Sequence, residues 1–202
     1  MRIFQDSSAP NPRRVRIFLA EKQIEIPFEQ IDLANQQQLG ERFLAINPLG
    51  ELPVLELDDG SYITETMAIC RYFELLHPDP CLFGNSPREQ AEVEMWNRRM
   101  EFHLLLNVAH CFQHSHPFFA GSKPQSSDYA EISRQRAGED MVLINTWLTE
   151  RPFIAGDKFT VADITALCAI DFARVVNIRI PDSSDNLADW HQRVSARPSS
   201  SA

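Results

Sequence analysis

The sequence has no long apolar run, and it has fewer basic than acidic residues. No apolar segment reaches the roughly 20 residues that a membrane-spanning helix needs, and the chain opens on a strand-like segment instead of a signal peptide. Lysine and arginine total 19 against 28 aspartates and glutamates, which gives a formal charge of -9. This charge disfavours binding to nucleic acid or to an anionic membrane surface. We therefore expect a soluble cytoplasmic protein with neither kind of partner.

Cysteine is also scarce, and its spacing gives no CxxC motif for redox chemistry or metal binding. Three of the four cysteines lie among apolar residues in helical patterns, so we expect buried, reduced thiols. The hydrophobic content of 44% is enough for a normal core.

Three histidines are grouped near the end of a predicted helix. His110 and His114 are four residues apart and share a helical face, a spacing found in metal sites. No carboxylate or cysteine completes an obvious ligand set, so we expect no metal. His114 and His116 are then either polar groups of a binding cleft or ordinary helix-end residues beside Pro117. Phe118 is either a wall of an apolar substrate pocket or a core residue.

The first part of the chain alternates predicted strands and helices. We expect strands at 2–5, 24–31, 54–57 and 61–63, and helices at 12–22, 41–46 and 65–76. The last two strands form a hairpin because Asp59 and Gly60 suit a tight turn. A strand–helix–strand unit followed by a hairpin and a helix gives a four-stranded mixed sheet with helices on both faces. This is the thioredoxin-like arrangement.

The second part of the chain is predicted to be helical throughout. Proline-rich residues 78–86 predict a linker, which leaves a first domain at 1–77 and a second at 87–202. A capping box at Ser86 opens a long helix to about residue 111. Further helices are expected at 127–150, 164–176 and 186–196; the middle one is apolar nearly all round and therefore central. Thr160 and Asp163 offer a capping box for this central helix, and residues 199–201 are expected to fray.

Two predicted helix starts have features of an anion or amino-acid site. Glu65 and Thr66 open one helix, where free backbone amides can hold a carboxylate and the glutamate can hold an ammonium. Asn11 is expected to cap the first helix, ahead of a proline at the first helical position. Arg13 and Arg14 then fall in the first turn, where they either stabilise a bound anion or are simply solvated.

Pro53 directly precedes a predicted strand. A cis Leu52–Pro53 bond leaves the Leu52 backbone available to an extended peptide ligand. An ordinary trans proline at the start of a strand is the more frequent arrangement. The residues alone leave both arrangements open.

Four segments, in this order and at these separations, resemble a cytosolic glutathione transferase. They are Pro12–Lys22 (PRRVRIFLAEK), Asn47–Leu55 (NPLGELPVL), Glu65–Ile69 (ETMAI) and Phe159–Ile164 (FTVADI). The resemblance covers nearly the whole chain. It implies a thioredoxin-like N-terminal domain, an all-helical C-terminal domain, a cytoplasmic homodimer and a role in detoxification.

The resemblance also implies which residues contact glutathione, the co-substrate. By the family pattern, Leu52 is the backbone partner of the cysteinyl unit and Pro53 is cis. Glu65 and Thr66 hold the γ-glutamyl end, and Gln38 lies where many members contact the glycyl end. The pattern assigns the pair formed by Thr160 and Asp163 to folding.

The catalytic position departs from the family pattern. Members with Ser-Pro-Asn before the first helix use the serine to hydrogen-bond the glutathione thiolate, whereas this chain has Ala9-Pro10-Asn11. We expect Ser8 first, then Ser7 and the Asn11-capped helix start, to share the role. The alternative is a microbial branch that relies on helix-start amides, water and polar groups of the second domain.

Three functions are compatible with these features. The first is conjugation of glutathione to a small hydrophobic electrophile, with His114, His116 and Phe118 in the substrate pocket. The second is glutathione-dependent reduction of peroxides or disulfides. The third is a non-catalytic glutathione transferase-like binding protein, which fits the missing serine but not the retained glutathione contacts.

Overall fold

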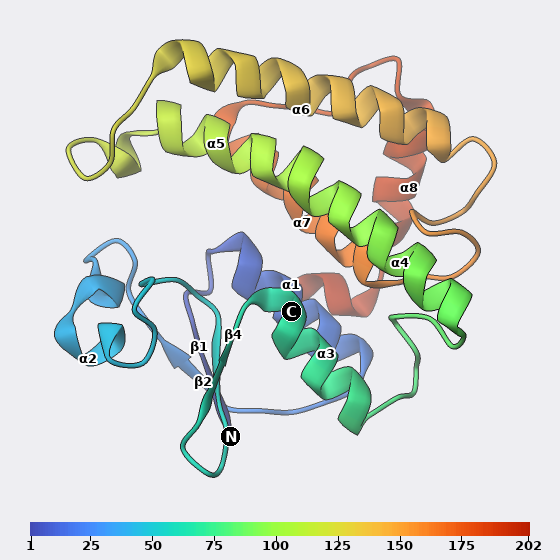
Figure 1. The fold of residues 1–202 in the computed structure, drawn as a ribbon. Helices are drawn as coiled ribbons and strands as arrows, with labels where there is room; N and C mark the ends of the chain where they lie inside the picture. The colour runs from blue at the N-terminus through green and yellow to red at the C-terminus, as the bar shows by residue number, and fades with distance from the viewer. The chain divides into compact units, whose positions relative to one another are not determined.

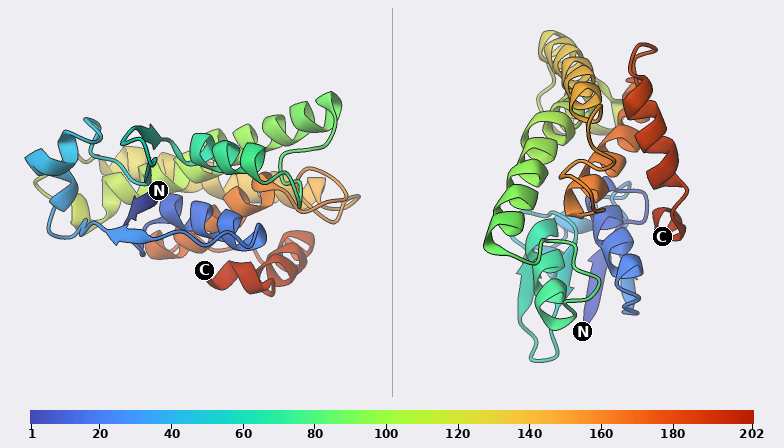
Figure 2. Two further views of the ribbon diagram at one scale, coloured as in Figure 1. Left: turned by 90° about the horizontal axis from the view of Figure 1, so that it is seen from below. Right: turned by 90° about the vertical axis from the view of Figure 1, so that its right-hand side faces the viewer.

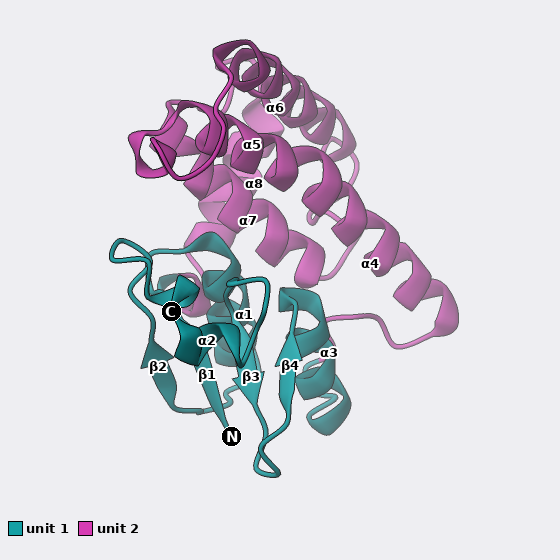
Figure 3. Cartoon of the chain, turned by 60° about the vertical axis from the view of Figure 1, so that its left-hand side comes forward, with its two compact units in different colours: residues 1–80, 201–202 teal, residues 81–200 magenta.

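The computed structural model covers residues 1–202, which form two compact units (Figure 3). Unit 1 comprises Met1–Pro80 together with Ser201–Ala202, and unit 2 comprises Cys81–Ser200. None of the helices combines the length and the apolar character that crossing a membrane requires.

Unit 1 contains a four-stranded mixed sheet with strand order β2-β1-β3-β4 (Figure 3). β2 runs parallel to β1, and the other neighbours are antiparallel, so the predicted thioredoxin-like topology is confirmed. β2 is shorter than expected because the preceding Pro27 has no backbone N–H to give to the ladder. The elements in order are β1 (Arg2–Gln5), α1 (Pro10–Glu21), β2 (Phe28–Gln30), a 3₁₀ turn (Gln37–Leu39), α2 (Glu41–Leu44), β3 (Val54–Glu56), β4 (Tyr62–Thr64) and α3 (Thr66–Leu76).

Both faces of the sheet are covered. Phe4 and Val54 are paired neighbours on one face and form a buried cluster with Phe43 of α2, whose ring centroid is 6.1 Å from that of Phe4. Side chains alternate along a strand, so Ile3 and Leu55, both fully buried, belong to the opposite face. Helices α1 and α3 pack together on that side (Figure 3).

The first helix begins earlier than expected. Its N-cap is Ala9 and its first residue is Pro10, so the predicted Asn11 cap is wrong. Pro10 already has the fixed φ that suits the first helical position, which places Asn11 inside the first turn. There the Asn11 side-chain oxygen accepts a hydrogen bond from Arg14 Nη1 at 3.2 Å. Arg14 is only 2% exposed, so it is not a solvated side chain.

Unit 2 is helical, as expected. The predicted long helix from residue 87 is present, but its middle turn is a π-helix, here called η2 (Figures 1 and 2). The serine-rich end forms a 3₁₀ turn in which Ser199 is buried, in place of the expected fraying. The elements are α4 (Pro87–Arg99), η2 (Met100–Leu105), α5 (Leu106–Ser115), a 3₁₀ turn (Pro117–Phe119), α6 (Ser127–Trp147), α7 (Val161–Ala173), a 3₁₀ turn (Arg174–Val176), α8 (Asp185–Ser195) and a 3₁₀ turn (Pro198–Ser201).

Helix α7 is the core of unit 2, because 11 of its 13 residues are buried. Thr160 and Asp163 form a capping box at its start. The Asp163 carboxylate accepts hydrogen bonds from the backbone N–H groups of Thr160 and Ile154 and from Trp190 Nε1, each at 2.9 Å. Complete burial raises the pKa of Asp163 to about 6. One carboxylate thus ties the start of α7 to the preceding loop and to α8.

Replacing Asp163 with alanine should destabilise the protein. Four buried donors lose their acceptor, because the Thr160 hydroxyl also donates to Asp163, at 3.2 Å. The free energy of unfolding should therefore fall by about 4 kcal/mol, roughly 1 kcal/mol for each donor. Guanidinium denaturation measures this change. Asp157→Ala, which removes an exposed aspartate of the same loop, is the control and should change stability by less than about 0.5 kcal/mol. An unchanged denaturation midpoint for Asp163→Ala would contradict the structural role.

Candidate functional site

The register of the strands brings four loops to one end of the sheet in unit 1. Val54 is paired with Phe4 of β1 and with Thr64 of β4. Both pairings are antiparallel, so the segments after β1, before β3 and after β4 meet at this end. Because β2 is parallel to β1 and places Gln30 beside Gln5, the segment after β2 reaches the same end. These loops carry the predicted residues Ser7, Ser8, Gln38, Leu52, Pro53 and Glu65.

The segment before β3 offers an unpaired piece of backbone. The Leu52–Pro53 bond is cis, as the resemblance implied. Asn47 fixes the loop, since its Nδ2 donates to the Glu51 carbonyl at 2.9 Å and its Oδ1 accepts from the Leu49 N–H at 3.2 Å. The N–H and C=O of Leu52 form no hydrogen bond within the chain. An extended peptide can pair with these two groups as an added strand would.

The segment after β4 combines a carboxylate with a helix start. Glu65 is the N-cap of α3, is exposed, and has a φ of 69°. Positive φ is uncommon for a residue with a side chain, and such residues cluster at functional sites. The first hydrogen bond inside the helix runs from the Ile69 N–H to the Glu65 carbonyl, so the amides of Thr66 to Ala68 are not used by the helix. A carboxylate beside free amides suits the ammonium and carboxylate of an amino acid.

The segment after β1 carries the two serines. Ser8 donates to Asp6 Oδ1 through its backbone N–H at 2.8 Å and through its hydroxyl at 2.5 Å. Burial acts to raise the pKa of Asp6, but hydrogen bonds from Ser8 and Leu33 outweigh it and leave this pKa below its usual value. Ser7 is held through its backbone, whose carbonyl accepts from Arg16 Nη2 at 3.0 Å. The Ser7 hydroxyl has no partner within the chain, whereas the Ser8 hydroxyl proton is used by Asp6.

The start of α1 presents a single free amide. Pro10 and Pro12 have no N–H, and the N–H of Arg13 already bonds to the Ala9 carbonyl at 3.3 Å. Only the N–H of Asn11 is left to carry the positive end of the helix dipole to a ligand. Most helix starts offer three free amides to an anion. The two prolines reduce this number to one and therefore weaken the anion site at the start of α1.

Gln38 lies in the 3₁₀ turn that follows β2. Its side-chain Oε1 is buried without a partner, which is unusual for a polar atom in a folded protein. Gly50, at φ +63°, approaches this turn so closely that a Cβ there would lie 3.2 Å from the Gln38 carbonyl oxygen. The close approach fixes the turn against the loop that contains Leu52.

The second-unit residues predicted to line a substrate pocket lie at the end of α5. His114 Nδ1 accepts from the N–H of Ser126 at 3.1 Å, and His116 Nδ1 accepts from the N–H of Phe118 at 3.2 Å. Phe118 is 44% exposed. Both histidines thus hold the chain that follows α5. No group of three or more histidine, cysteine or acidic side chains is placed to hold a metal ion.

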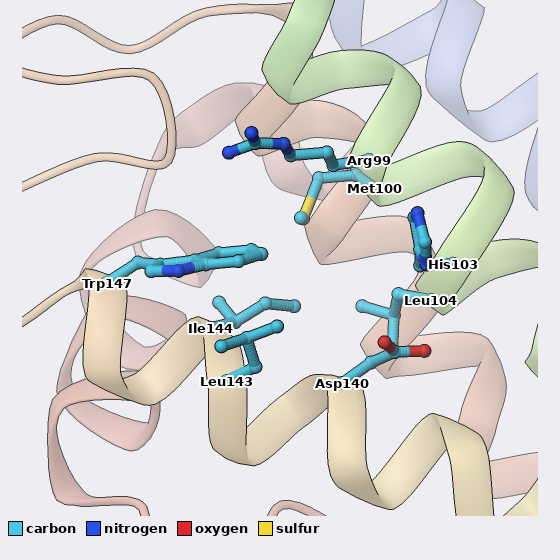
Figure 4. A pocket seen from close by; sticks show the side chains of 8 residues that line it. All are labelled: Arg99, Met100, His103, Leu104, Asp140, Leu143, Ile144 and Trp147. Carbon is cyan, nitrogen blue, oxygen red and sulfur yellow. The ribbon is translucent and has the colours of Figure 1, made fainter.

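Two residues that the sequence analysis did not single out line the cavities of unit 2. His103 and Asp140 both border two adjoining cavities between η2–α5 and α6, one of which is drawn in Figure 4. Burial raises the pKa of Asp140, against the hydrogen bond that its Oδ2 accepts from Asn107 Nδ2 at 3.0 Å. One signal was available: Asp140 is an acidic residue directly beside Met141 on the apolar face of a predicted helix.

Both parts of the chain match known protein families. The profile for "Glutathione S-transferase, N-terminal domain" matches residues 9–76, and that for "Glutathione S-transferase, C-terminal domain" matches residues 103–198. Glutathione S-transferase 2 of Saccharomyces cerevisiae is 37% identical, over 98% of this chain and 87% of its own length. Probable elongation factor 1-gamma 1 of Arabidopsis thaliana is 30% identical, over 84% of this chain but 41% of its own length.

Two crystal structures show the same fold along the full chain. Gtt2 from Saccharomyces cerevisiae has a TM-score of 0.94 at 37% identity, with 98% of each chain covered. A glutathione S-transferase domain-containing protein from Marinobacter aquaeolei has a TM-score of 0.94 at 38% identity, with 98% of this chain and 99% of that chain covered. With both domains matched in sequence and in structure, the chain belongs to the glutathione S-transferase family.

Proposed function

We propose that the chain binds glutathione at the end of the sheet where the four loops meet. There it conjugates the glutathione thiolate to a small hydrophobic electrophile. The observation that carries the proposal is the unpaired backbone of Leu52 at the same end of the sheet as Glu65 and the start of α3. Leu52 pairs with the cysteinyl backbone of glutathione, and Glu65 holds the γ-glutamyl ammonium. The amide of Thr66 binds the α-carboxylate, and Gln38 contacts the glycyl end. Family membership supports glutathione as the ligand.

The chemistry requires the glutathione sulfur as a thiolate. The thiol loses its proton to solvent, a sulfur lone pair forms a bond to the electrophilic carbon, and a leaving group such as halide departs with its bonding electrons. A thiol has a pKa near 8.5, and this pKa must fall by roughly one to two units for the thiol to be mostly ionised at neutral pH. Such a fall corresponds to about 1.4 to 2.7 kcal/mol. The start of a helix contributes about 0.3 to 2 kcal/mol, and one charge-assisted hydrogen bond about 1.5 to 3 kcal/mol.

The groups available for this task are few. The Asn11 amide supplies the helix-start contribution, although Asn11 does not cap the helix. The Ser7 hydroxyl is open, and the Ser8 hydroxyl must turn away from Asp6 before it can donate to sulfur. We propose that Ser8 and Ser7 share the role with this amide. The magnitudes above make such a site slow but functional.

Unit 2 selects the electrophile in this proposal. Phe118 supplies an exposed aromatic face, and its ring centroid lies 5.0 Å from that of Phe119. His114 and His116 add polar edges beside this aromatic pair. We assign no particular electrophile, because the fold alone does not specify one.

Glu65→Gln should weaken glutathione binding. The substitution keeps the shape of the side chain but removes the charge that pairs with the γ-glutamyl ammonium, so Kd should rise about tenfold or more. Isothermal titration calorimetry measures this change. Glu25→Gln, which changes an exposed glutamate on the segment that leads into β2, is the matched control and should bind like the wild type. Equal affinities for Glu65→Gln and the wild type would remove Glu65 from the site.

The double variant Ser7→Ala/Ser8→Ala should lower turnover of an activated aryl halide by about tenfold, because one charge-assisted hydrogen bond to sulfur is lost. Glutathione affinity should stay unchanged, and the pKa of bound glutathione, followed by thiolate absorbance, should rise. Ser61→Ala is a close control, since Ser61 bonds Asp59 through its N–H and hydroxyl at 2.9 and 2.6 Å, much as Ser8 bonds Asp6. Full turnover by the double variant would move thiolate activation to unit 2.

The two alternative functions separate from conjugation in a short series of assays. Retention on immobilised glutathione is followed by parallel assays with an aryl halide and an organic hydroperoxide. Turnover of the aryl halide supports conjugation, and turnover of the hydroperoxide alone supports reduction. Retention without either activity supports a non-catalytic binding protein. The presence of Ala9, where other family members have a serine, favours this alternative.

We also propose that the chain forms a homodimer. Phe102 and Leu106, four residues apart on η2 and α5, are 60% and 41% exposed. Exposed apolar surface of this kind marks association sites. Sedimentation velocity should therefore give the mass of two chains, and Phe102→Ser should shift the population towards one. A wild type that sediments as a single chain at all concentrations would exclude the dimer.

A further inference from the structure

Strand β2 is an open edge of the sheet in unit 1 (Figure 3). It is three residues long, and β1 is its only partner strand. No other helix or strand packs extensively against it. An open edge of this kind can pair with a further extended chain.

The outer side of β2 carries unpaired backbone groups. On the inner side, the Pro27 carbonyl accepts from the Ile3 N–H at 2.9 Å, and the Ile31 N–H donates to β1 at 2.7 Å. Backbone groups of successive residues point to opposite sides of a strand, so those of Phe28 and Gln30 face outward. These N–H and C=O groups form no hydrogen bond within the chain. They offer two donors and two acceptors to an added strand.

A cavity of about 400 Å³ lies beside this edge, on the face of the sheet that α2 covers. Its floor is apolar and comprises Phe4, Ile31, Phe43 and Ile46. Glu29 of β2 also lines the cavity, and it lies on the same face as its register partner Phe4. A side chain of an added strand that lies opposite Glu29 points to this face as well. That side chain therefore enters the cavity.

The rim of the cavity carries an unpaired carboxylate. Glu29 is already paired with Arg2 at 2.7 Å and with Arg42 at 3.5 Å. Glu41, which is exposed at the rim, has no cationic partner within the chain. The chain as a whole has a net charge of -9. A long basic side chain complements this cavity, because its apolar stem covers the floor while its charged head stays at the rim.

We propose that β2 binds an extended basic peptide, which adds a fifth strand to the four-stranded sheet. The peptide backbone exchanges hydrogen bonds with Phe28 and Gln30. A lysine or arginine opposite Glu29 places its stem in the cavity and its charge beside Glu41. Backbone pairing supplies the affinity, and the cavity with its carboxylate supplies the selectivity. This site is separate from the proposed glutathione site and does not depend on it.

The first test varies the peptide. The probe is a fluorescein-labelled nonapeptide of serine, threonine and valine with a central lysine, and fluorescence anisotropy should show saturable binding. Norleucine in place of lysine keeps the stem but removes the charge, so it should bind at least about threefold more weakly. N-methylation of the lysine and both its neighbours removes the N–H groups that pair with the edge and should weaken binding by at least about tenfold. The same three methyl groups near the ends of the peptide should leave binding unchanged.

The second test varies the protein. Phe28→Pro removes an outward N–H that β1 does not use, at an edge position where proline is tolerated, whereas Phe28→Ala keeps this N–H. The proline variant should bind the peptide at least about fivefold more weakly than the alanine variant. Glu41→Gln should abolish the preference for lysine over norleucine. Glu150→Gln, which removes the same charge from an exposed position in unit 2, should retain this preference, and circular dichroism should show that each variant is folded.

Several outcomes would overturn the proposal. They are equal binding of the lysine and norleucine peptides, full binding of the centrally N-methylated peptide, equal affinities of Phe28→Pro and Phe28→Ala, and a loss of lysine preference in Glu150→Gln as large as that in Glu41→Gln. Saturating glutathione should leave the peptide affinity unchanged, and displacement by glutathione would place the peptide in the other site. Pairing of β2 with a second copy, seen in sedimentation velocity as an assembly larger than two chains that Phe28→Pro dissociates, would also overturn it.

Discussion

The double pairing of β3 holds the candidate glutathione site together. Val54 bonds into the sheet between Phe4 and Thr64, and this register alone decides that the loops after β1 and β4 meet beside Leu52. A shift by one residue would turn Val54 and Leu55 to the wrong faces of the sheet. Both are fully buried, so the core on each face resists the shift. Packing in the sheet therefore decides where the loops meet, and hydrogen bonds such as those of Asn47 then fix the loops themselves.

The sequence predicted the sheet, the hairpin and the central helix α7, because hydrophobic periodicity and turn residues are local signals. It failed where two signals competed or where none existed. Pro10 and Pro12 both suit the first helical position, and the choice of Pro10 displaced the expected Asn11 cap. The π turn at η2 leaves no mark in composition. The meeting of Asp140 with His103 depends on how α6 packs against η2, which local patterns do not encode.

Binding and activation of glutathione are separate problems in this chain. The groups assigned to binding, Leu52 and Glu65, lie unpaired and ready for a ligand. The groups proposed to activate the sulfur are weaker: Ala9 has no hydroxyl, the Ser8 hydroxyl donates its proton to Asp6, and the start of α1 offers one free amide. We therefore propose that the chain binds glutathione more readily than it ionises the glutathione thiol.

The most direct test of the account is backbone NMR of the Leu52 amide during titration with glutathione. This N–H has no partner in the free chain, so it should exchange rapidly with solvent before glutathione is added. When glutathione binds, we predict a downfield shift of its resonance and a slower hydrogen exchange, because a new hydrogen bond forms. Binding of glutathione with an unchanged Leu52 amide would contradict the proposed site.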